Sequence, residues 1–368
     1  MHLRTTWRLG VWTLLPTAFL LTGCAHSSQP TPQYRMIAVP TLTQQMSHTT
    51  ALLQAVSAVN DSVAWVSGHR ATWVRTADGG RTWVPGSMTG ADSALEFRDV
   101  YAVDASTAYL LAAGPGERSR IYKTTDAGAT WQLQFMNRDS AAFYDCLDFF
   151  DATHGIAVSD AVNGRLIVRR TEDGAHWNRI ADDRIPPALP GEGAFAASGT
   201  CLLARGRSLA WIGTGAESGS RVYRSSDGGR HWSVAATPVV SGRNSGVTAL
   251  AFWDDRHGMA LGGRLADPSD RSDSIAAVTD DGGLTWRVVA RPSFSGAVYG
   301  AAAVPGLGGY VVAVGPRGLD WLPAGASAWT NASSDAFWSV GFASRNAGWA
   351  VGPGGRIVHL AFAPPLVN

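Results

Sequence analysis

The stretch TADGGRTW at residues 76–83 decides the fold, because near copies of it return along the chain. The copies are TTDAGATW at 124–131, TEDGAHW at 171–177, SSDGGRHW at 225–232 and TDDGGLTW at 279–286. The aspartates of successive copies lie 48, 47, 54 and 54 residues apart. A period in this range is typical of units that stack or that surround a common axis.

Each repeating unit extends well beyond the shared motif. The run VAWVSGHRATWVRT at 63–76 reads as two β-strands joined by a tight turn, and corresponding runs precede the other copies. Runs of the same kind at 309–322 and 348–362 mark two further units that lack the motif. Seven units of four strands each predict an all-β fold, a seven-bladed β-propeller of four-stranded antiparallel blades.

The last unit predicts how the ring is closed. It spans about 336–362 and supplies only three strands, whereas YRMIAV at 34–39 is a strand-like run without a unit of its own. We therefore expect the N-terminal strand 34–39 to complete the last blade and to cover an edge that could otherwise pair with other chains. The repeats then fill about 51–362 of a single propeller domain at 34–368.

The N-terminus resembles a bacterial lipoprotein signal. A basic start and a short apolar run end in Leu21-Thr22-Gly23-Cys24, so residues 1–23 are expected to be removed and Cys24 to carry lipid. Residues 24–33 then form a flexible tether. Ala25 after the lipidated cysteine implies the outer membrane, with the domain facing the periplasm or the cell surface. The alternative is an ordinary signal peptide in which the cysteine occurs by chance.

Composition excludes some classes of function. Lys and Arg number 30 against 29 Asp and Glu, so the basic face that nucleic-acid binding requires is not expected. The nine histidines are scattered, and there is no C-x-x-C, so we predict neither a metal site nor a cofactor.

The repeated motif itself predicts structure and not chemistry. Its aspartate can accept hydrogen bonds from its own turn, its glycine permits unusual backbone angles, and its tryptophan buries a large ring. Identical residues repeated around a ring cannot all face one active site. The residues assigned this structural role are Asp78, Trp83, Asp126, Trp131, Asp173, Trp177, Asp227, Trp232, Asp281 and Trp286.

Two cysteines remain in the predicted domain, in YDCLDFF and SGTCLLA. Cys146 and Cys201 occupy equivalent positions of consecutive blades, and equivalent side chains should point the same way around the ring. We therefore expect two buried free thiols in preference to a disulfide, although the oxidising compartment permits one.

Charged and polar residues on the predicted inner strands are candidates for binding a partner at one mouth of the channel. These candidates are Arg98, Asp99, Tyr144, Asp145, Asp148, Glu192 and Arg243. The alternative is that they pair with one another and brace adjacent blades, because buried charges need partners. The long Pro-rich loop at 181–198 could cover the same mouth.

The whole of residues 51–362 resembles the BNR/Asp-box repeat proteins related to the photosystem II stability and assembly factor. The resemblance rests on the recurring Trp-bearing unit and on GEGAFAASGT at 191–200. It implies a non-enzymatic scaffold whose partner is a protein, such as a membrane protein or a complex under assembly, with the membrane reached only through the lipid anchor.

Sialidases share the Asp-box motif, so a sialidase-like glycoside hydrolase acting on extracytoplasmic glycans is the alternative. The Arg-Ile-Pro motif of that family precedes the first Asp box, whereas Arg184-Ile185-Pro186 follows the third one here. Only five glutamates are available as partners of a tyrosine nucleophile. The sequence therefore favours the scaffold.

Overall fold

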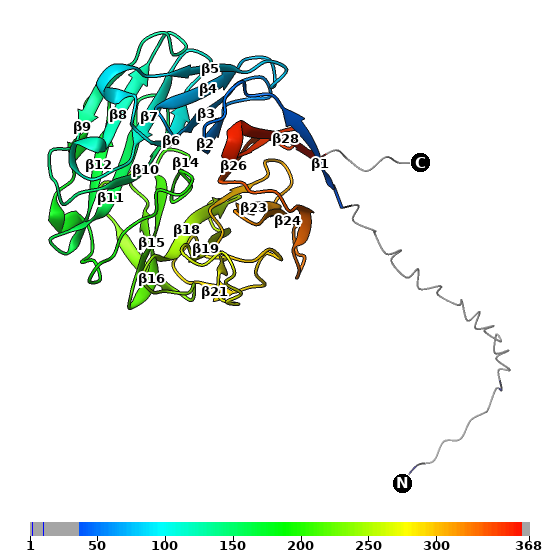
Figure 1. Cartoon of the computed structure of the whole chain (residues 1–368). Helices are drawn as coiled ribbons and strands as arrows, with labels where there is room; N and C mark the ends of the chain where they lie inside the picture. The colour runs from blue at the N-terminus through cyan, green and yellow to red at the C-terminus, as the bar shows by residue number, and fades with distance from the viewer. Residues whose placement is uncertain (1, 3–9, 11–36, 363–368) are drawn as a thin grey trace. The chain divides into compact units, whose positions relative to one another are not determined.

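The computed structural model of this chain describes residues 37–362, together with residues 2 and 10. The predicted signal peptide, Cys24, the tether and residues 34–36 lie outside the described residues. Within the described range the chain forms seven four-stranded antiparallel sheets around a central axis, as predicted (Figure 1).

Each blade begins with its innermost strand and proceeds outward. The first three blades are β2 (Leu53–Ala58), β3 (Ala64–Gly68), β4 (Thr72–Thr76) and β5 (Val84–Ser87); β6 (Phe97–Ala102), β7 (Ala108–Ala112), β8 (Arg120–Thr124) and β9 (Gln132–Met136); and β10 (Tyr144–Phe149), β11 (Gly155–Val162), β12 (Arg165–Thr171) and β13 (Asn178–Arg179). The next three are β14 (Leu202–Arg205), β15 (Leu209–Ala216), β16 (Gly219–Ser225) and β17 (Ser233–Thr237); β18 (Ser245–Phe252), β19 (Gly258–Arg264), β20 (Ala276–Thr279) and β21 (Arg287–Val288); and β22 (Gly300–Ala303), β23 (Val311–Gly315), β24 (Gly318–Leu322) and β25 (Thr330–Ser333). The seventh contains β26 (Ser339–Ser344), β27 (Ala347–Gly352), β28 (Arg356–Phe362) and β1 (Pro40–Gln45). Four single-turn 3-10 helices lie in the connections, at Gly90–Asp92, Gly116–Arg118, Asp182–Arg184 and Pro353–Gly355.

The ring is closed by an N-terminal strand, but the strand is not the predicted one. β1 pairs antiparallel with β28 from Pro40 opposite Phe362 to Gln45 opposite Ile357, and residues 37–39 precede the ladder. The prediction chose 34–39 because that run is apolar, whereas β1, with the sequence PTLTQQ, is mostly polar. An outermost strand keeps one face in water, so it needs few apolar residues, and proline is tolerated at its first position.

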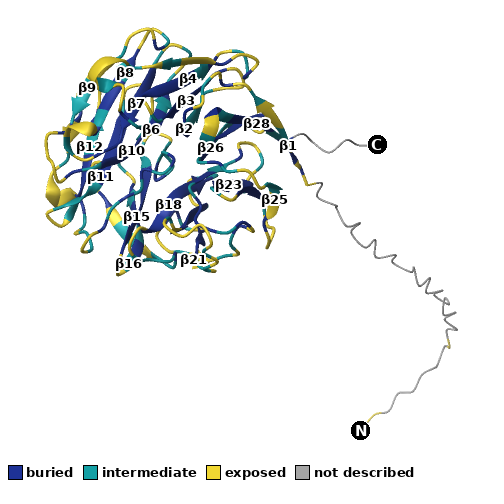
Figure 2. Cartoon of the chain, in the orientation of Figure 1, coloured by how far each residue is buried: buried dark blue, intermediate teal, exposed yellow. Residues whose placement is uncertain are grey.

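Burial follows the position of a strand within its blade. Every residue of β3 and β7 is buried, whereas β5 and β13 at the rim are largely exposed (Figure 2). The second strand of a blade packs against neighbouring blades on both faces, so its sequence is almost wholly apolar, as in AYLLA of β7. Hydrophobic contact between blades, together with β1, therefore holds the wheel together.

The first Asp box has the geometry that the sequence predicts. Asp78 accepts hydrogen bonds from the backbone N–H of Thr82 at 2.9 Å and from its hydroxyl at 2.6 Å. Thr76 completes the turn, because its hydroxyl donates to Asp78 and accepts from the N–H of Gly80. Gly80 has a φ of +80°, which a residue with a Cβ resists. The corresponding bonds recur around Asp126, Asp227 and Asp281.

The third box is a tighter turn than the other four. This motif is one residue shorter than the others, and Asp173 accepts hydrogen bonds from the N–H groups of Ala175 and His176. The hydroxyl of Thr171 accepts the N–H of Gly174, three residues further on, whereas in the first box the donor is four residues further on. The five boxes belong to five different blades, each at the turn before the outermost strand. They therefore do not converge on a common cavity.

Candidate functional site

A channel runs along the axis of the wheel and contains a cavity of about 450 Å³ lined by the inner strands of all blades. Small residues such as Ala302 and Gly341 line one side, and Tyr101 and Asp148 line the other. Each inner strand enters at one end of the channel and leaves at the end where the Asp boxes lie. We name these two sides of the wheel the plug face and the Asp-box face.

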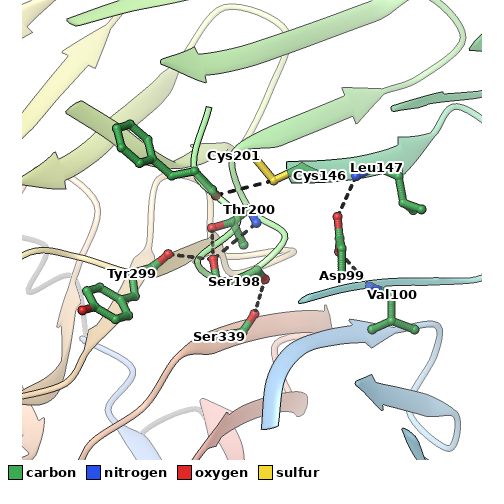
Figure 3. Close-up of a disulfide and its surroundings, with 10 residues drawn as sticks. Asp99, Val100, Cys146, Leu147, Ser198, Thr200, Cys201, Tyr299 and Ser339 are labelled. Atoms are coloured by element: carbon green, nitrogen blue, oxygen red, sulfur yellow. Dashed lines mark hydrogen bonds between the residues drawn. A yellow bond between two sulfur atoms is a disulfide. The ribbon is translucent and has the colours of Figure 1, made fainter. Parts of the chain in front are cut away.

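Residues 189–201, which we name the plug, lie at one end of the channel, where Ser198, Gly199 and Thr200 line the cavity. Ser198 donates a hydrogen bond to the carbonyl of Tyr299 at 2.6 Å, and Ser339 donates to the carbonyl of Ser198 at 2.9 Å (Figure 3). The carbonyl of Thr200 accepts the N–H of Leu250. The plug thereby contacts blades that are far apart in sequence, and it covers the mouth as the loop at 181–198 suggested.

Cys146 and Cys201 form a disulfide, so the expectation of two free thiols is wrong. Cys146 lies within β10, whereas Cys201 lies in the turn at the end of the plug, one residue before β14. The two residues are equivalent in register, but the turn frees Cys201 from the pleat of a strand. Its side chain can therefore point sideways to the adjacent blade, where the Cα atoms are 6.2 Å apart (Figure 3).

Asp99 and Asp148 brace adjacent blades. Asp99 accepts the N–H groups of Val100 in its own strand and of Leu147 in the next blade, at 2.8 and 2.7 Å (Figure 3). Asp148 repeats this pattern one blade further with Phe149 and Ala204. Burial raises the pKa of Asp148 to about 7 and raises the pKa of Asp99 well above its ordinary value. These carboxyl groups therefore brace adjacent blades, which is the alternative to partner binding given above. They do so by accepting hydrogen bonds from backbone N–H groups and not by forming ion pairs with one another.

Two more predicted residues are also buried and paired internally. Glu192 accepts hydrogen bonds from Thr214 at 2.6 Å and from Arg221, which also forms an ion pair with it. Burial alone would raise the pKa of Glu192, yet these hydrogen bonds lower it below its ordinary value. The hydroxyl of Tyr144 accepts a hydrogen bond from Arg169 at 2.6 Å. Neither residue is free to bind a partner.

Asp145 lies against a residue that sequence reasoning missed. It is 2% exposed and lies near Asp160 on β11, a half-buried residue that lines the groove beside the plug. Burial and the neighbouring carboxyl group raise the pKa of Asp145, and burial raises the pKa of Asp160. An aspartate inside the otherwise apolar run GIAVSDAV was the signal that could have found it.

Arg98 and Arg243 are the predicted residues that remain accessible, on the plug face. Arg98 is partly exposed and donates to Glu96 at 3.0 Å. Arg243 is exposed and lines a groove of about 690 Å³ beside the plug. The structure thus brings most predicted residues near the plugged mouth, and it leaves Arg98 and Arg243 accessible on the plug face and Asp148 facing the channel.

A basic hollow lies on the opposite, Asp-box face, and the sequence analysis did not single it out. Arg170, Arg207 and Arg230 line a hollow of about 570 Å³ between the third and fourth blades, together with His154 and Asp151. Burial, and after it the charge of Arg230, lowers the pKa of Arg170. We name Arg170, Arg207 and Arg230 the arginine hollow. The sequence does not predict this site, because arginines are common along the chain and only the fold brings these three together.

The members of the arginine hollow differ in how far they are engaged. Arg170 donates to the carbonyl of Gly228 at 2.7 Å and braces two blades. Glu172 accepts a hydrogen bond from Arg170 and another from Arg230, both at 3.1 Å. Arg207 is exposed and forms no ion pair or side-chain hydrogen bond with the described residues. The hollow therefore carries more positive than negative charge.

The arrangement of carboxyl groups argues against the usual glycosidase scheme at the plugged mouth. That scheme places two carboxyl groups roughly 5–10 Å apart beside an open substrate site. Asp145 is instead buried, and Asp160 beside it lies against Gly193 of the plug. Among residues 37–362, no cluster of three or more metal-ligating side chains and no helix long and apolar enough to cross a membrane is present.

Comparison with known proteins relates the chain to others by fold. No protein-family model and no curated protein matches the sequence. YCF48 bound to D1 peptide superimposes with a TM-score of 0.59 at 15% identity, over 91% of this chain and 100% of that one. YCF48 from Cyanidioschyzon merolae gives 0.62 at 13% identity, over 87% and 98%.

The GH74 xyloglucanase from Xanthomonas campestris gives a TM-score of 0.61 at 15% identity, over 90% of this chain but 55% of the enzyme. The chain thus spans about half the length of that enzyme, and the full length of the YCF48 structures. At these identities the likeness concerns the fold. The chain is accordingly a seven-bladed β-propeller that carries five Asp boxes.

Proposed function

We propose that this protein is a non-enzymatic binding scaffold that holds an acidic segment of a partner polypeptide on its Asp-box face. The observation that carries the proposal is the arginine hollow, with Arg207 unpaired among the described residues. Guanidinium groups bind carboxylates through two parallel hydrogen bonds, so an excess of them at one hollow favours an acidic or carboxylate-terminated segment.

The open mouth of the channel adjoins the arginine hollow. Arg205 at the end of β14 lines the channel, and Arg207 in the turn between β14 and β15 lines the hollow. A segment bound at the hollow could therefore extend toward the axis. The complex of YCF48 with D1 peptide supports a polypeptide ligand, because that propeller has the same architecture over its full length.

The place of action belongs to the same proposal. Lipid on Cys24 would hold the propeller at the outer membrane, with residues 24–33 as a tether, and the partner would be a membrane protein or a complex under assembly. Replacing Cys24 by serine should release the protein from membranes into the soluble fraction. Unchanged membrane association of the Cys24→Ser variant would refute the anchor and leave the binding site untouched.

Binding of labelled peptides tests the arginine hollow. The variant Arg207→Glu/Arg230→Glu should weaken binding of an Asp/Glu-rich peptide by at least about tenfold, or roughly 1.4 kcal/mol. The matched control is Arg81→Glu, because Arg81 has the place in the first Asp box that Arg230 has in the fourth. Equal losses in both variants, or binding that ignores salt, would contradict the proposal.

A glycan hydrolase is the second candidate, because the GH74 enzymes share the fold. Two features disfavour it: Asp145 is buried, and Asp99 and Asp148 are engaged with the backbone. Release of reducing sugar from an extracytoplasmic glycan, abolished by Asp148→Asn but not by Asp183→Asn, would favour the hydrolase. Absence of turnover with a broad panel of glycans would remove it.

A further inference from the structure

The channel cavity of about 450 Å³ has a mostly apolar wall. Its lining includes the aromatic residues Tyr101, Phe149, Phe252 and Phe342. Tyr101 stacks on Phe149, with ring centroids 4.6 Å apart. Ligand pockets in proteins typically have volumes of about 300–1,000 Å³, apolar and aromatic walls and a small number of polar groups. The channel therefore has the size and the lining of a binding site.

The charged groups of this wall are already engaged within the protein. Both carboxylate oxygens of Asp99 accept backbone N–H groups, and so do both oxygens of Asp148. Arg205 is the only cation among the residues that line the cavity, and it donates to Asp255 at 2.9 Å. The hydroxyl of Tyr101 has no hydrogen-bond partner among the described residues. The wall thus offers no free cation to a carboxylate, but it offers a hydroxyl oxygen to a ring that carries an N–H group.

The channel and the arginine hollow adjoin at two places in the chain. Phe149 lines the channel, and the next residue, Phe150, lines the hollow. Arg205 lines the channel, and Arg207, two residues further on, lines the hollow. Two residues of extended chain span about 7 Å, so a ligand in the hollow reaches the channel within roughly two to five of its own residues. A segment bound at the hollow therefore places a neighbouring side chain at the channel mouth.

The charges of the two sites select different parts of such a segment. A carboxylate in the channel would lie near Asp99 and Asp148 without a free cation, whereas the hollow supplies three arginines. A lysine would have to approach past those arginines, and the channel carboxylates already hold two N–H donors each. A neutral aromatic ring instead removes apolar surface from water on both partners and packs against the rings of the wall.

We propose that the channel is a socket for an aromatic side chain, tryptophan above all, of the same partner segment that the arginine hollow holds; this inference rests on the proposed function. The recognised motif is an aromatic residue within about two to five residues of an acidic cluster. Tryptophan fits best, because its indole N–H can donate to the hydroxyl of Tyr101. Aromatic anchors seated in a pocket carry a large share of the binding energy at protein interfaces.

Three labelled peptides test the socket on the whole protein. They share one acidic cluster and carry tryptophan, alanine or lysine about three residues from it. The tryptophan peptide should bind at least about tenfold more tightly than the alanine peptide. Both affinities should fall with added salt while their ratio persists, because the hollow attracts charge and the socket buries apolar surface.

Filling the channel tests where the tryptophan binds. In Ala302→Phe a ring occupies the channel, so the ratio of the two affinities should fall to about one. The matched control Ala236→Phe adds the same ring to exposed β17 and should keep the ratio. If Ala302→Phe fails to fold, fluorine NMR of a peptide with 5-fluorotryptophan replaces it. The fluorine bound to the wild type should resist broadening by a soluble paramagnetic probe.

The outcomes distinguish the socket from the hollow. A ratio of at least about tenfold that disappears in Ala302→Phe and persists in Ala236→Phe supports the socket. Equal affinities of the tryptophan and alanine peptides for the wild type overturn it and leave the arginine hollow standing. Tighter binding of the lysine peptide overturns it as well, because the channel would then select a cation. A ratio that survives in Ala302→Phe, or a bound fluorine open to the probe, also overturns it. Absence of binding by all three peptides refutes the proposed function and the socket with it.

Discussion

Gln45 is the residue through which the closing strand fastens the wheel, and its removal is the most informative perturbation of stability. Its Oε1 accepts the indole N–H of Trp83 in the first blade at 3.0 Å and that of Trp349 in the last blade at 3.1 Å. Its side-chain amide also donates to the carbonyl of Gly79 at 3.3 Å. One side chain on β1 thus joins the first blade to the seventh.

The magnitude follows from the two indole groups. Trp83 and Trp349 are 3% and 0% exposed, so water does not readily replace the lost acceptor. A buried donor without a partner costs about 1–3 kcal/mol. Gln45→Ala leaves two such donors and should therefore lower the free energy of unfolding by about 2–6 kcal/mol.

Urea unfolding followed by tryptophan fluorescence measures this loss, with Gln44→Ala as the control. Gln44 is exposed on the same strand, and among the described residues its side chain bonds only to the carbonyl of Gln45. We expect the control to change stability by less than about 0.5 kcal/mol. Equal stability of the two variants would refute the role assigned to Gln45 and, with it, the contribution of β1 to closure.

Two further predictions concern the disulfide and the pH dependence of stability. Replacing Cys146 and Cys201 together by alanine should cost up to about 4 kcal/mol in urea unfolding, because their bond closes a 55-residue separation in the unfolded chain; a loss under about 1 kcal/mol would contradict this. Stability should increase from pH 8 to pH 5, because burial raises the pKa of Asp148 to about 7 and that of Asp145 above its ordinary value, so the folded state binds more protons there. Below pH 4 it should fall, because hydrogen bonds within the Asp boxes lower the pKa values of Asp78 and Asp281 to about 2, so the unfolded state binds more protons. Free energies of unfolding measured from pH 2 to pH 8 check both limbs, and a monotonic profile would contradict one of them.

The repeat made the architecture predictable, because each unit contains a complete set of local signals. The strand pairs, the glycines and the Asp-box turns are determined by residues close in sequence, and seven such units can bury their faces only in a ring. The closing strand was less predictable. The apolar residues of 34–39 favoured that run as the closing strand. β1 lies at the rim and makes its main side-chain contacts with the blades through Leu42, which packs against the core, and Gln45, which accepts the indole N–H of Trp83.

The candidate site was harder to predict, because it depends on where the blades place distant residues. Register alignment located Cys146 and Cys201 correctly but could not show that a turn redirects Cys201. Asp99 and Asp148 were recognised as inner-strand carboxylates, yet their partners are N–H groups of the next blade, which the sequence cannot identify. The arginine hollow combines residues of two blades, and although Arg230 belongs to the fourth Asp box, nothing in the sequence places Arg170 and Arg207 beside it.

A photo-reactive amino acid at position 208, on the rim of the arginine hollow, tests the central claim most directly. Ser208 and Ser62 occupy equivalent turns, since each carbonyl accepts the N–H of an Asp-box glycine, so position 62 is the matched control. In membranes of the native host, mass spectrometry should identify an acidic polypeptide segment crosslinked from position 208 and not from position 62. Crosslinks to no polypeptide, or the same crosslinks from both positions, would contradict the account of this propeller as a scaffold that binds through its Asp-box face.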